Sequence, residues 1–299
     1  MSSSRERNDR SRPFSKGGKS GQDTGRKAAA KAGAPRAKPE RAPYDPARER
    51  PSRGPRHKPH DGGTEWLWGW HAVLAALANP NRAGFKRLLV APAKAREVEQ
   101  AAARLKLAPE FAEASDIARA LPPGAVHQGV ARLAEPLEGV AREAFLDGPG
   151  GLLLMLDQLT DPQNVGAIFR SAAAFGARGV ILQDRHAPLL TGALAKAAAG
   201  AVDALPHARV VNLSRALEQL AEAGWRAVGL DGAADQTLDE ALDSRPTVLV
   251  LGSEGDGVRR LVAEHCDTLA RIPMPGGFES LNVSNAAAVA LYEAARKRR

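Results

Sequence analysis

The sequence has little cysteine and no long apolar run. Its one cysteine, Cys266, excludes an internal disulfide and a zinc site built from several cysteines. No segment reaches the roughly 18 apolar residues that a membrane span needs, and the N-terminus lacks the apolar stretch of a signal peptide. We therefore expect a soluble, cytoplasmic protein that binds no membrane and no metal.

Negative charge is scarce in the first part of the chain. Of the 42 Lys and Arg and the 34 Asp and Glu, residues 1–63 hold 17 and 7, a net charge of +10, which leaves 25 against 27 for the rest, a net of −2. Residues 1–63 are rich in Pro, Gly, Ser and Arg, so they cannot bury enough apolar surface to fold alone. We predict a disordered basic tail that binds nucleic-acid phosphates or serves only as a solubilising extension.

Residues 64–135 are predicted to form a small α/β domain. Trp66, Trp68 and Trp70 alternate at its start, which favours a short strand, and the next residues have the pattern of a helix. A role in the core is the simpler interpretation of these tryptophans, with stacking on RNA bases as the alternative. Strands at residues 86–90 and 129–133 and helices near residues 94–107 and 115–121 complete this domain. A linker rich in acidic residues, Pro and Gly follows at residues 136–150.

From residue 151 to residue 299, short apolar runs alternate with helical patterns. This alternation predicts an α/β domain with a parallel sheet that is covered by helices on both faces. In such sheets, ligands bind beyond the carboxyl ends of the strands. Three polar loops of this domain are expected at that edge.

The first loop leads into a helix at residues 161–176. Asp161 is predicted as the N-cap and Pro162 as the first helical residue, so Asn164 lies in the first turn beside the unpaired N–H groups. Arg170 points away from the apolar stripe of this helix. Arg170 is therefore a candidate site residue, although a solvated surface arginine would show the same pattern.

The second loop is GSEGDG, residues 252–257, between a strand and a helix. It lacks the Gly-Lys-Ser/Thr ending of a P-loop, and Glu254 and Asp256 would repel a phosphate. A glycine-rich turn with an acidic residue suits a ligand that carries hydroxyl or amine groups. The alternative is a tight turn whose acidic residues interact with the helix dipole.

The third loop, IPMPGGFESLNVSNAAAVALYEA, spans residues 272–294 and enters an Ala-rich helix. Ser284 or Asn285 is predicted as the N-cap. Ser280 and Asn282 add more hydrogen-bonding groups than a cap needs, and the glycines allow close approach to a ligand. On spacing alone, a turn with redundant caps is an equally good interpretation.

In this order, the three loops resemble the three motifs of the TrmH/SpoU branch of the SPOUT RNA methyltransferases. The upstream segments GWHAVLAAL and GAVHQGV also resemble the accessory domain of the bacterial 23S rRNA guanosine 2′-O-methyltransferase subgroup. The resemblance thus covers about residues 66–299 and leaves out the basic tail. One departure from the subgroup is Asn285 followed by AAAVA, where many members have Val followed by Ala-Thr-Gly.

The resemblance implies a SPOUT domain with a deep trefoil knot, preceded by a small substrate-binding domain that resembles a ribosomal protein. In this family the second and third loops form the knot and hold S-adenosyl-L-methionine in a bent shape. Backbone groups would bind the adenine and the methionine part. The positions that match the family are Gly252, Ile272 and Leu281, and Met274 and Gly276 lie nearby in the sequence.

The resemblance also implies the reaction, which is 2′-O-methylation of a ribose in RNA, at a guanosine of 23S rRNA. Arg170 would be the catalytic residue, as a base or as a stabiliser of the developing alkoxide. The other matching polar positions of the active site are Asn164, Glu254, Ser280 and Asn282. Family members are homodimers in which the first motif of one subunit lies near the cofactor of the other. The alternatives are a tRNA methyltransferase of the same fold and a non-catalytic rRNA-binding assembly factor.

Overall fold

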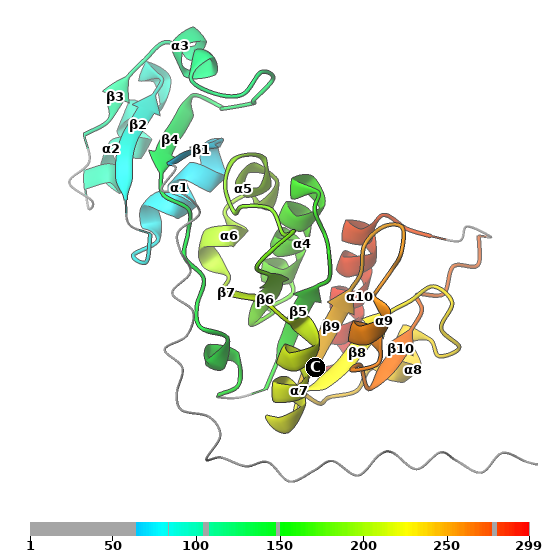
Figure 1. Cartoon of the computed structure of the whole chain (residues 1–299). Coiled ribbons are helices and arrows are strands. Elements are labelled where there is room, and N and C mark those ends of the chain that lie inside the picture. Colours follow the sequence, from blue (N-terminus) through cyan, green and yellow to red (C-terminus); the bar gives the residue numbers. More distant parts are fainter. Residues whose placement is uncertain (1–63, 83, 104–107, 148–149, 277–279, 299) are drawn as a thin grey trace, which may run out of the picture. The chain divides into compact units, whose positions relative to one another are not determined.

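The computed structural model describes residues 64–82, 84–103, 108–147, 150–276 and 280–298, which contain two β-sheets with helices packed on them (Figure 1). The basic tail, residues 1–63, lies outside the described residues. Its disorder therefore stays a prediction, as do the domain boundaries at residues 63, 135 and 150.

The N-terminal sheet has four strands in the order β1-β4-β2-β3. Strand β4 is antiparallel to β1 and β2, and β3 is parallel to β2. The strand predicted from Trp66, Trp68 and Trp70 is present but ends before Trp70. Gly69 has a left-handed φ of 90°, and α1 begins directly after it. The elements are β1 Glu65–Trp68, α1 Trp70–Ala78, β2 Phe85–Val90, the 3-10 turn η2 Pro92–Lys94, α2 Ala95–Ala103, β3 Glu110–Phe111, α3 Ala114–Arg119 and β4 Val130–Ala134.

The C-terminal sheet has six strands in the order β10-β8-β9-β5-β6-β7, and every neighbouring pair is parallel. The predicted α/β class with a parallel sheet is therefore confirmed. The elements are β5 Leu152–Leu156, α4 Pro162–Ala174, β6 Gly179–Gln183, α5 Gly192–Ala198, α6 Ala201–Ala204, β7 His207–Val210, α7 Leu213–Glu222, β8 Arg226–Leu230, α8 Leu238–Ala241, β9 Thr247–Leu251, α9 Arg260–Ala263, β10 Thr268–Ala270 and α10 Val283–Lys297.

Alternating residues of β5 enter different apolar clusters, because successive side chains of a strand point to opposite faces. Leu152, Leu154 and Leu156 pack in one cluster with α4, α5, α6, α8 and α10. Leu153 and Met155 pack in the other with α7, α9 and Phe145 of the 3-10 turn η3, Arg142–Phe145. The sheet is thus buried on both faces, and polar groups can reach solvent only at its edges and ends.

Residues 136–147, predicted as a linker, pack against the C-terminal sheet. Phe145 is buried in the cluster with α7, and the Val140 N–H donates a hydrogen bond to the His207 carbonyl oxygen at 2.8 Å. The composition of this segment predicted a linker because acidic residues, Pro and Gly dominate it. The packing depends on only a few apolar residues, which the overall composition does not reveal.

The carboxyl ends of β5, β8, β9 and β10 lie at the same edge of the sheet, since all these strands run parallel. Each of the three polar loops leaves from this edge, as the sequence predicted. The trefoil knot remains a prediction. None of the described helices is long and apolar enough to cross a membrane.

Candidate active site

The loop between β5 and α4 presents Asn164 at the sheet edge. The Asp161 carboxylate caps α4 by accepting hydrogen bonds from the backbone N–H groups of Gln163, at 3.2 Å, and Asn164, at 3.0 Å. Pro162 is the first helical residue, so the predicted start of this helix is confirmed. Because the cap fixes the first turn, the Asn164 side chain projects from a well-defined position.

The loop after β9 closes on itself and carries Glu254 at its tip. Ser253 and Gly257 exchange two backbone hydrogen bonds, of 3.0 and 3.1 Å. A Cβ on Gly252 would lie 1.9–2.1 Å from the backbone C and O of Gly257 and the backbone N of Val258. Only glycine therefore allows the two limbs of this loop to approach so closely.

The loop before α10 ends at Asn282, which is the N-cap of that helix. Its Oδ1 accepts hydrogen bonds from the backbone N–H of Ser284 at 3.0 Å and from the Ser284 hydroxyl at 2.6 Å. The predicted cap, Ser284 or Asn285, is therefore wrong. Both residues lie inside the first turn, because the Asn282 side chain already satisfies the orphan N–H group.

The side chains of Asn164, Glu254 and Asn282 meet in a triangle of hydrogen bonds, which we call the polar triangle. Glu254 Oε1 accepts from Asn164 Nδ2 at 2.7 Å and from Asn282 Nδ2 at 2.9 Å. Asn282 Nδ2 also lies 3.0 Å from Asn164 Oδ1, which accepts from it. Three residues separated by up to 118 positions are thereby fixed at one solvent-accessible point. The second oxygen of Glu254, Oε2, has no hydrogen-bond donor among the residues that the structure describes.

Arg170 is not part of the polar triangle. It lies on the exposed face of α4, and no hydrogen bond or ion pair joins it to another described residue. Six helical positions separate it from Asn164, which corresponds to a rise of about 9 Å and to a different side of the helix. Within one chain, the predicted catalytic arginine and the predicted polar residues therefore do not come together.

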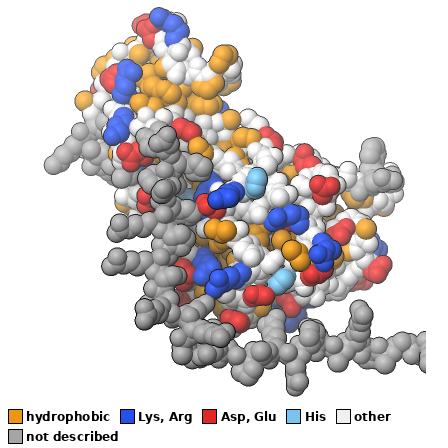
Figure 2. Space-filling view, viewed as in Figure 1, with side chains coloured by type: hydrophobic (Ala, Val, Ile, Leu, Met, Phe, Trp, Pro, Cys, Tyr) orange, Lys and Arg blue, Asp and Glu red, His pale blue; other side chains and the backbone are white. Residues whose placement is uncertain are grey.

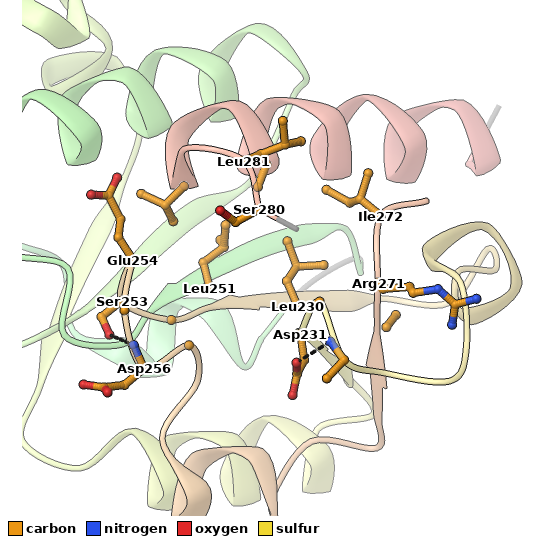
Figure 3. A pocket seen from close by; sticks show the side chains of 18 of the residues that line it. Leu230, Asp231, Leu251, Ser253, Glu254, Asp256, Arg271, Ile272, Ser280 and Leu281 are labelled. Carbon is orange, nitrogen blue, oxygen red and sulfur yellow. Dashed lines mark hydrogen bonds between the residues drawn. The ribbon is translucent and has the colours of Figure 1, made fainter. Parts of the chain in front are cut away.

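A cavity of about 700 Å³ opens beside the polar triangle, because Glu254 of the triangle also lines the cavity. Figure 3 shows side chains of this lining. Its size falls in the range of sites for small molecules and cofactors. Leu230, Leu251 and Leu281 lie around its centre, whereas the Arg271 side chain points away and donates to the Ala234 carbonyl oxygen at 2.6 Å. The lining comes from the loops after β8, β9 and β10 and from the start of α10.

Most of the predicted cofactor positions lie in this cavity. Gly252, Ile272, Met274 and Leu281 line it, together with Ser280 and Glu254 from the predicted catalytic set. Gly276 is not among the lining residues. The sequence did not indicate Asp231, which follows β8 and lines the cavity. A useful signal was present, because Asp231 is the first polar residue after a buried strand, at the edge where ligands bind.

The electrostatics of the cavity favour a neutral or cationic ligand. Asp231, Glu254 and Asp256 are among the lining residues and place negative charge around the cavity, and the guanidinium of Arg271 is turned away. A phosphate group would be repelled by this lining. Among the described residues, no group of three or more His, Cys, Asp or Glu side chains could hold a metal ion.

Two family models match this chain. Residues 151–292 match the SpoU rRNA Methylase family. Residues 66–140 match a family described as RNA 2′-O ribose methyltransferase substrate binding. The three loops and the cavity all lie within the first match.

Relatives from mycobacteria share part of the chain. An uncharacterized tRNA/rRNA methyltransferase of Mycolicibacterium gilvum (strain PYR-GCK) is 46% identical over 179 residues, which are 58% of this chain and 57% of that protein. A protein with the same description from Mycobacterium avium (strain 104) is 44% identical over 178 residues, with 58% of each chain covered. The matched region is thus little more than half the length of these relatives.

Solved structures share the fold at 26–28% sequence identity. The SpoU methyltransferase AviRb from Streptomyces viridochromogenes, in complex with the cofactor AdoMet, has a TM-score of 0.64 at 28% identity and covers 79% of this chain and 91% of its own. The AdoMet-bound rRNA methyltransferase from Sinorhizobium meliloti has a TM-score of 0.65 at 26% identity, with 78% and 87% covered.

Proposed function

Since residues 151–292 match the SpoU rRNA Methylase family and residues 66–140 a substrate-binding family of RNA 2′-O ribose methyltransferases, we propose that the chain transfers a methyl group from S-adenosylmethionine to a ribose 2′-hydroxyl of RNA. The observation that supports this most directly is the cavity of about 700 Å³ beside the exposed polar triangle. Glu254 belongs to both, so a ligand in the cavity and a ribose at the triangle would be neighbours.

The lining of the cavity fits S-adenosylmethionine. When bound, this cofactor supplies an electrophilic methyl group on a positively charged sulfur. The carboxylates of Asp231 and Asp256 complement its positive charge, and Leu251, Ile272 and Leu281 offer apolar walls. Backbone groups around Gly252 and Met274 would hold its polar parts. Gly276 stays a predicted contact, although it does not line the cavity.

Glu254 and its partners would orient the ribose. A 2′-hydroxyl is a poor nucleophile until its proton is removed or the charge on its oxygen is stabilised. The two amides hold Oε1 of Glu254, which leaves Oε2 to accept a hydrogen bond from a ribose hydroxyl or a guanidinium. In this proposal Asn164 and Asn282 fix the carboxylate, and Ser280 at the cavity wall helps to fix the loop and the RNA.

Arg170 would act on the cavity of a second copy of the chain, in a homodimer. Two observations support this. The arginine has no partner among the described residues, and it lies on a different side of α4 from Asn164. An arginine stays protonated at neutral pH, so we assign it the stabilisation of the 2′-oxygen and of an adjacent phosphate, not proton removal.

We place the substrate in 23S rRNA, at a guanosine, with a tRNA as the alternative. Residues 66–140 match a substrate-binding family. A second domain that binds RNA supports a substrate that extends well beyond the methylated ribose. The mycobacterial relatives are described as tRNA/rRNA methyltransferases, which leaves both classes open. Comparing the 2′-O-methyl positions of rRNA and tRNA from cells with and without the protein would identify the target.

The central experiment concerns Arg170. We expect Arg170→Ala to lower single-turnover methyl transfer to 23S rRNA fragments by about a hundredfold or more, with little change in S-adenosylmethionine affinity. Arg170→Lys should restore little, because an ammonium cannot contact the ribose oxygen and a phosphate together as a guanidinium can. The matched control is Arg245→Ala, an exposed arginine that precedes β9 at the opposite edge of the sheet. Near-normal transfer by Arg170→Ala would remove this residue from the mechanism.

A further inference from the structure

An ion pair between the buried Asp157 and the partly exposed Arg259 joins two loops that lead to the polar triangle. Asp157 directly follows β5, and its side chain has no exposed surface. Its Oδ1 accepts from Arg259 Nε at 2.8 Å and lies 2.7 Å from a terminal guanidinium nitrogen, while its Oδ2 accepts from the Arg259 backbone N–H at 3.0 Å. Both carboxylate oxygens are therefore engaged by one residue.

The ion pair lies at the roots of the loops that present Asn164 and Glu254. Asp157 precedes Asn164 by seven positions, and Arg259 follows Glu254 by five. The Asp157 backbone N–H donates to the Leu251 carbonyl oxygen at 2.8 Å, which extends the pairing of β5 with β9. The outgoing limb of the Glu254 loop is thus held by the sheet, whereas the returning limb is tied to β5 through the Asp157 side chain.

The first loop is held from the other side as well. Gln158 adopts a left-handed φ of 56°, and its backbone N–H donates to the side-chain oxygen of Gln183 at 3.1 Å. A non-glycine residue in this conformation needs surrounding contacts that maintain it. The segment from Asp157 to Asp161 is therefore fixed at its base. The ion pair of Asp157 with Arg259, which we call the clamp, couples the position of this segment to that of the second loop.

We propose that Asp157 and Arg259 are positioning residues that hold Glu254 against Asn164 and so set the rate of methyl transfer. This inference rests on the proposed function. The pair touches neither the cavity nor the polar triangle, because neither residue lines the cavity and neither bonds to the triangle among the described residues. Small displacements of reacting groups are costly, since a shift of about 1 Å can lower a rate by about a hundredfold.

The competing role for Arg259 is direct contact with an RNA phosphate, since 41% of its side chain is exposed. The two roles predict different behaviour of Asp157. A clamp requires both residues, so that loss of either has the same kind of effect. A phosphate contact requires only the arginine, and removal of the Asp157 charge would then leave RNA affinity unchanged or raise it.

The test compares Asp157→Asn, Arg259→Gln and the double variant in single-turnover methyl transfer. For the clamp, each single variant lowers kcat by about tenfold to a hundredfold, while KM for RNA and S-adenosylmethionine affinity change by less than about threefold. The double variant is no slower than the slower single variant, because the two residues act as one unit. Arg259→Lys, which keeps both charges and the fold, retains part of the rate. The control Arg260→Gln changes the neighbouring exposed arginine, which pairs with Glu264 on the surface, and leaves kcat unchanged.

Hydrogen exchange provides a measurement that does not depend on activity. The clamp predicts faster amide exchange in residues 253–259 of Arg259→Gln and Asp157→Asn, with β6 and β7 unchanged. If the wild-type protein methylates no RNA, the proposed function fails, and the exchange data still decide the clamp. Unchanged exchange and turnover in Asp157→Asn would overturn the clamp. Weaker RNA binding confined to Arg259→Gln would also overturn it and assign Arg259 to the RNA.

Discussion

At the scale of single residues, Gly252 is a position where backbone geometry constrains the loop that we propose binds the cofactor. A Cβ there would overlap the backbone of Gly257 and Val258, which cannot move without opening the loop. We predict that Gly252→Ala lowers S-adenosylmethionine affinity by more than about tenfold, because the loop that lines the cavity can no longer close. Calorimetric titration would measure this. Gly255→Ala is the control, since a Cβ at Gly255 meets nothing within 4 Å, and equal losses in both variants would contradict the explanation.

His207, at the start of β7, is a buried histidine that stays neutral in the folded protein. Burial, followed by the positive charges of Arg209 and Arg82, lowers its pKa from 6.5 to about 4. Its Nε2 has no hydrogen-bond partner among the described residues, and its ring packs edge-on against Phe169 at 6.2 Å between centroids. The folded state therefore resists protonation of this ring.

The neutral His207 makes stability depend on pH in acid. Above pH 6.5 both states carry the neutral ring, but between pH 6.5 and about 4 only the unfolded chain binds the proton. The free energy of unfolding should thus fall across this window as pH drops, by up to about 3 kcal/mol from this group. Denaturant titrations at several pH values should show a smaller pH slope for His207→Leu, with His71→Gln, an exposed histidine, as the control. An unchanged slope in His207→Leu would show that other groups cause the acid sensitivity.

The sequence indicated the residues of the polar triangle but not the clamp behind them. Glu254 and Asn282 stood out because each is polar and lies in a loop after an apolar run, and Asn164 because it is a polar residue in the first turn of the next helix. Asp157 is equally polar and follows β5 directly, yet its partner lies 102 positions away. No local pattern shows such a pairing, so its function became visible only from the contact. The cap at Asn282 was missed for a related reason, because several residues of that segment have the side chains of caps.

At the scale of elements, long apolar runs predicted their strands and helices well. Helices α4 and α10 fall on the helices predicted after the first and third loops, and the six strands of the C-terminal sheet alternate with helices as the apolar runs predicted. The missed elements are short ones, such as β3 with two residues and α8 with four. Helix α8 depends on a capping box between Thr237 and Glu240 and on the burial of Leu238, which are features too brief to give a periodic signal.

Helix α10 carries an apolar surface that we assign to the proposed homodimer. Val289 and Tyr292 are 43% and 57% exposed and lie three positions apart, so they share one face of the helix. The Tyr292 ring packs edge-on against the Phe175 ring, with 6.0 Å between the ring centroids. We predict a dimer at micromolar concentration that Val289→Glu/Tyr292→Glu converts to monomers, because buried carboxylates without partners are costly. Sedimentation velocity would measure this. Leu261→Glu, at an exposed leucine of α9, should leave the dimer intact, and a monomeric wild-type protein would refute the assignment.

At the scale of the whole molecule, a parallel sheet brings the three loops together. Its strands all end at one edge, so loops that are distant in the sequence converge there. The sequence predicted this convergence, but it could not reveal the contacts between side chains of different loops. The sheet and its two covered faces followed from the alternation of apolar runs and helices. The predicted knot did not follow from periodicity at all, because periodicity describes elements and not the path of the chain between them.

The charge of the molecule divides between the tail and the rest. Residues 64–299 have a net charge of −2, and on the face drawn in Figure 2 basic and acidic side chains are interspersed. Such a surface attracts RNA only weakly over distance. The net charge of +10 lies in residues 1–63, which are outside the described residues.

We therefore predict that removal of residues 1–63 leaves folding and S-adenosylmethionine affinity unchanged but weakens RNA binding. The logarithm of the RNA binding constant should also depend less steeply on the logarithm of salt concentration, by roughly one unit for each phosphate that the tail neutralises in the full-length protein. Binding of 23S rRNA fragments at several salt concentrations would compare the two proteins. A full-length variant with the tail arginines changed to lysine is the matched control, because it keeps the charge and should keep the slope. Equal affinity and slope with and without the tail would leave it the role of a solubilising extension, and the attraction to RNA would then have to come from residues 64–299.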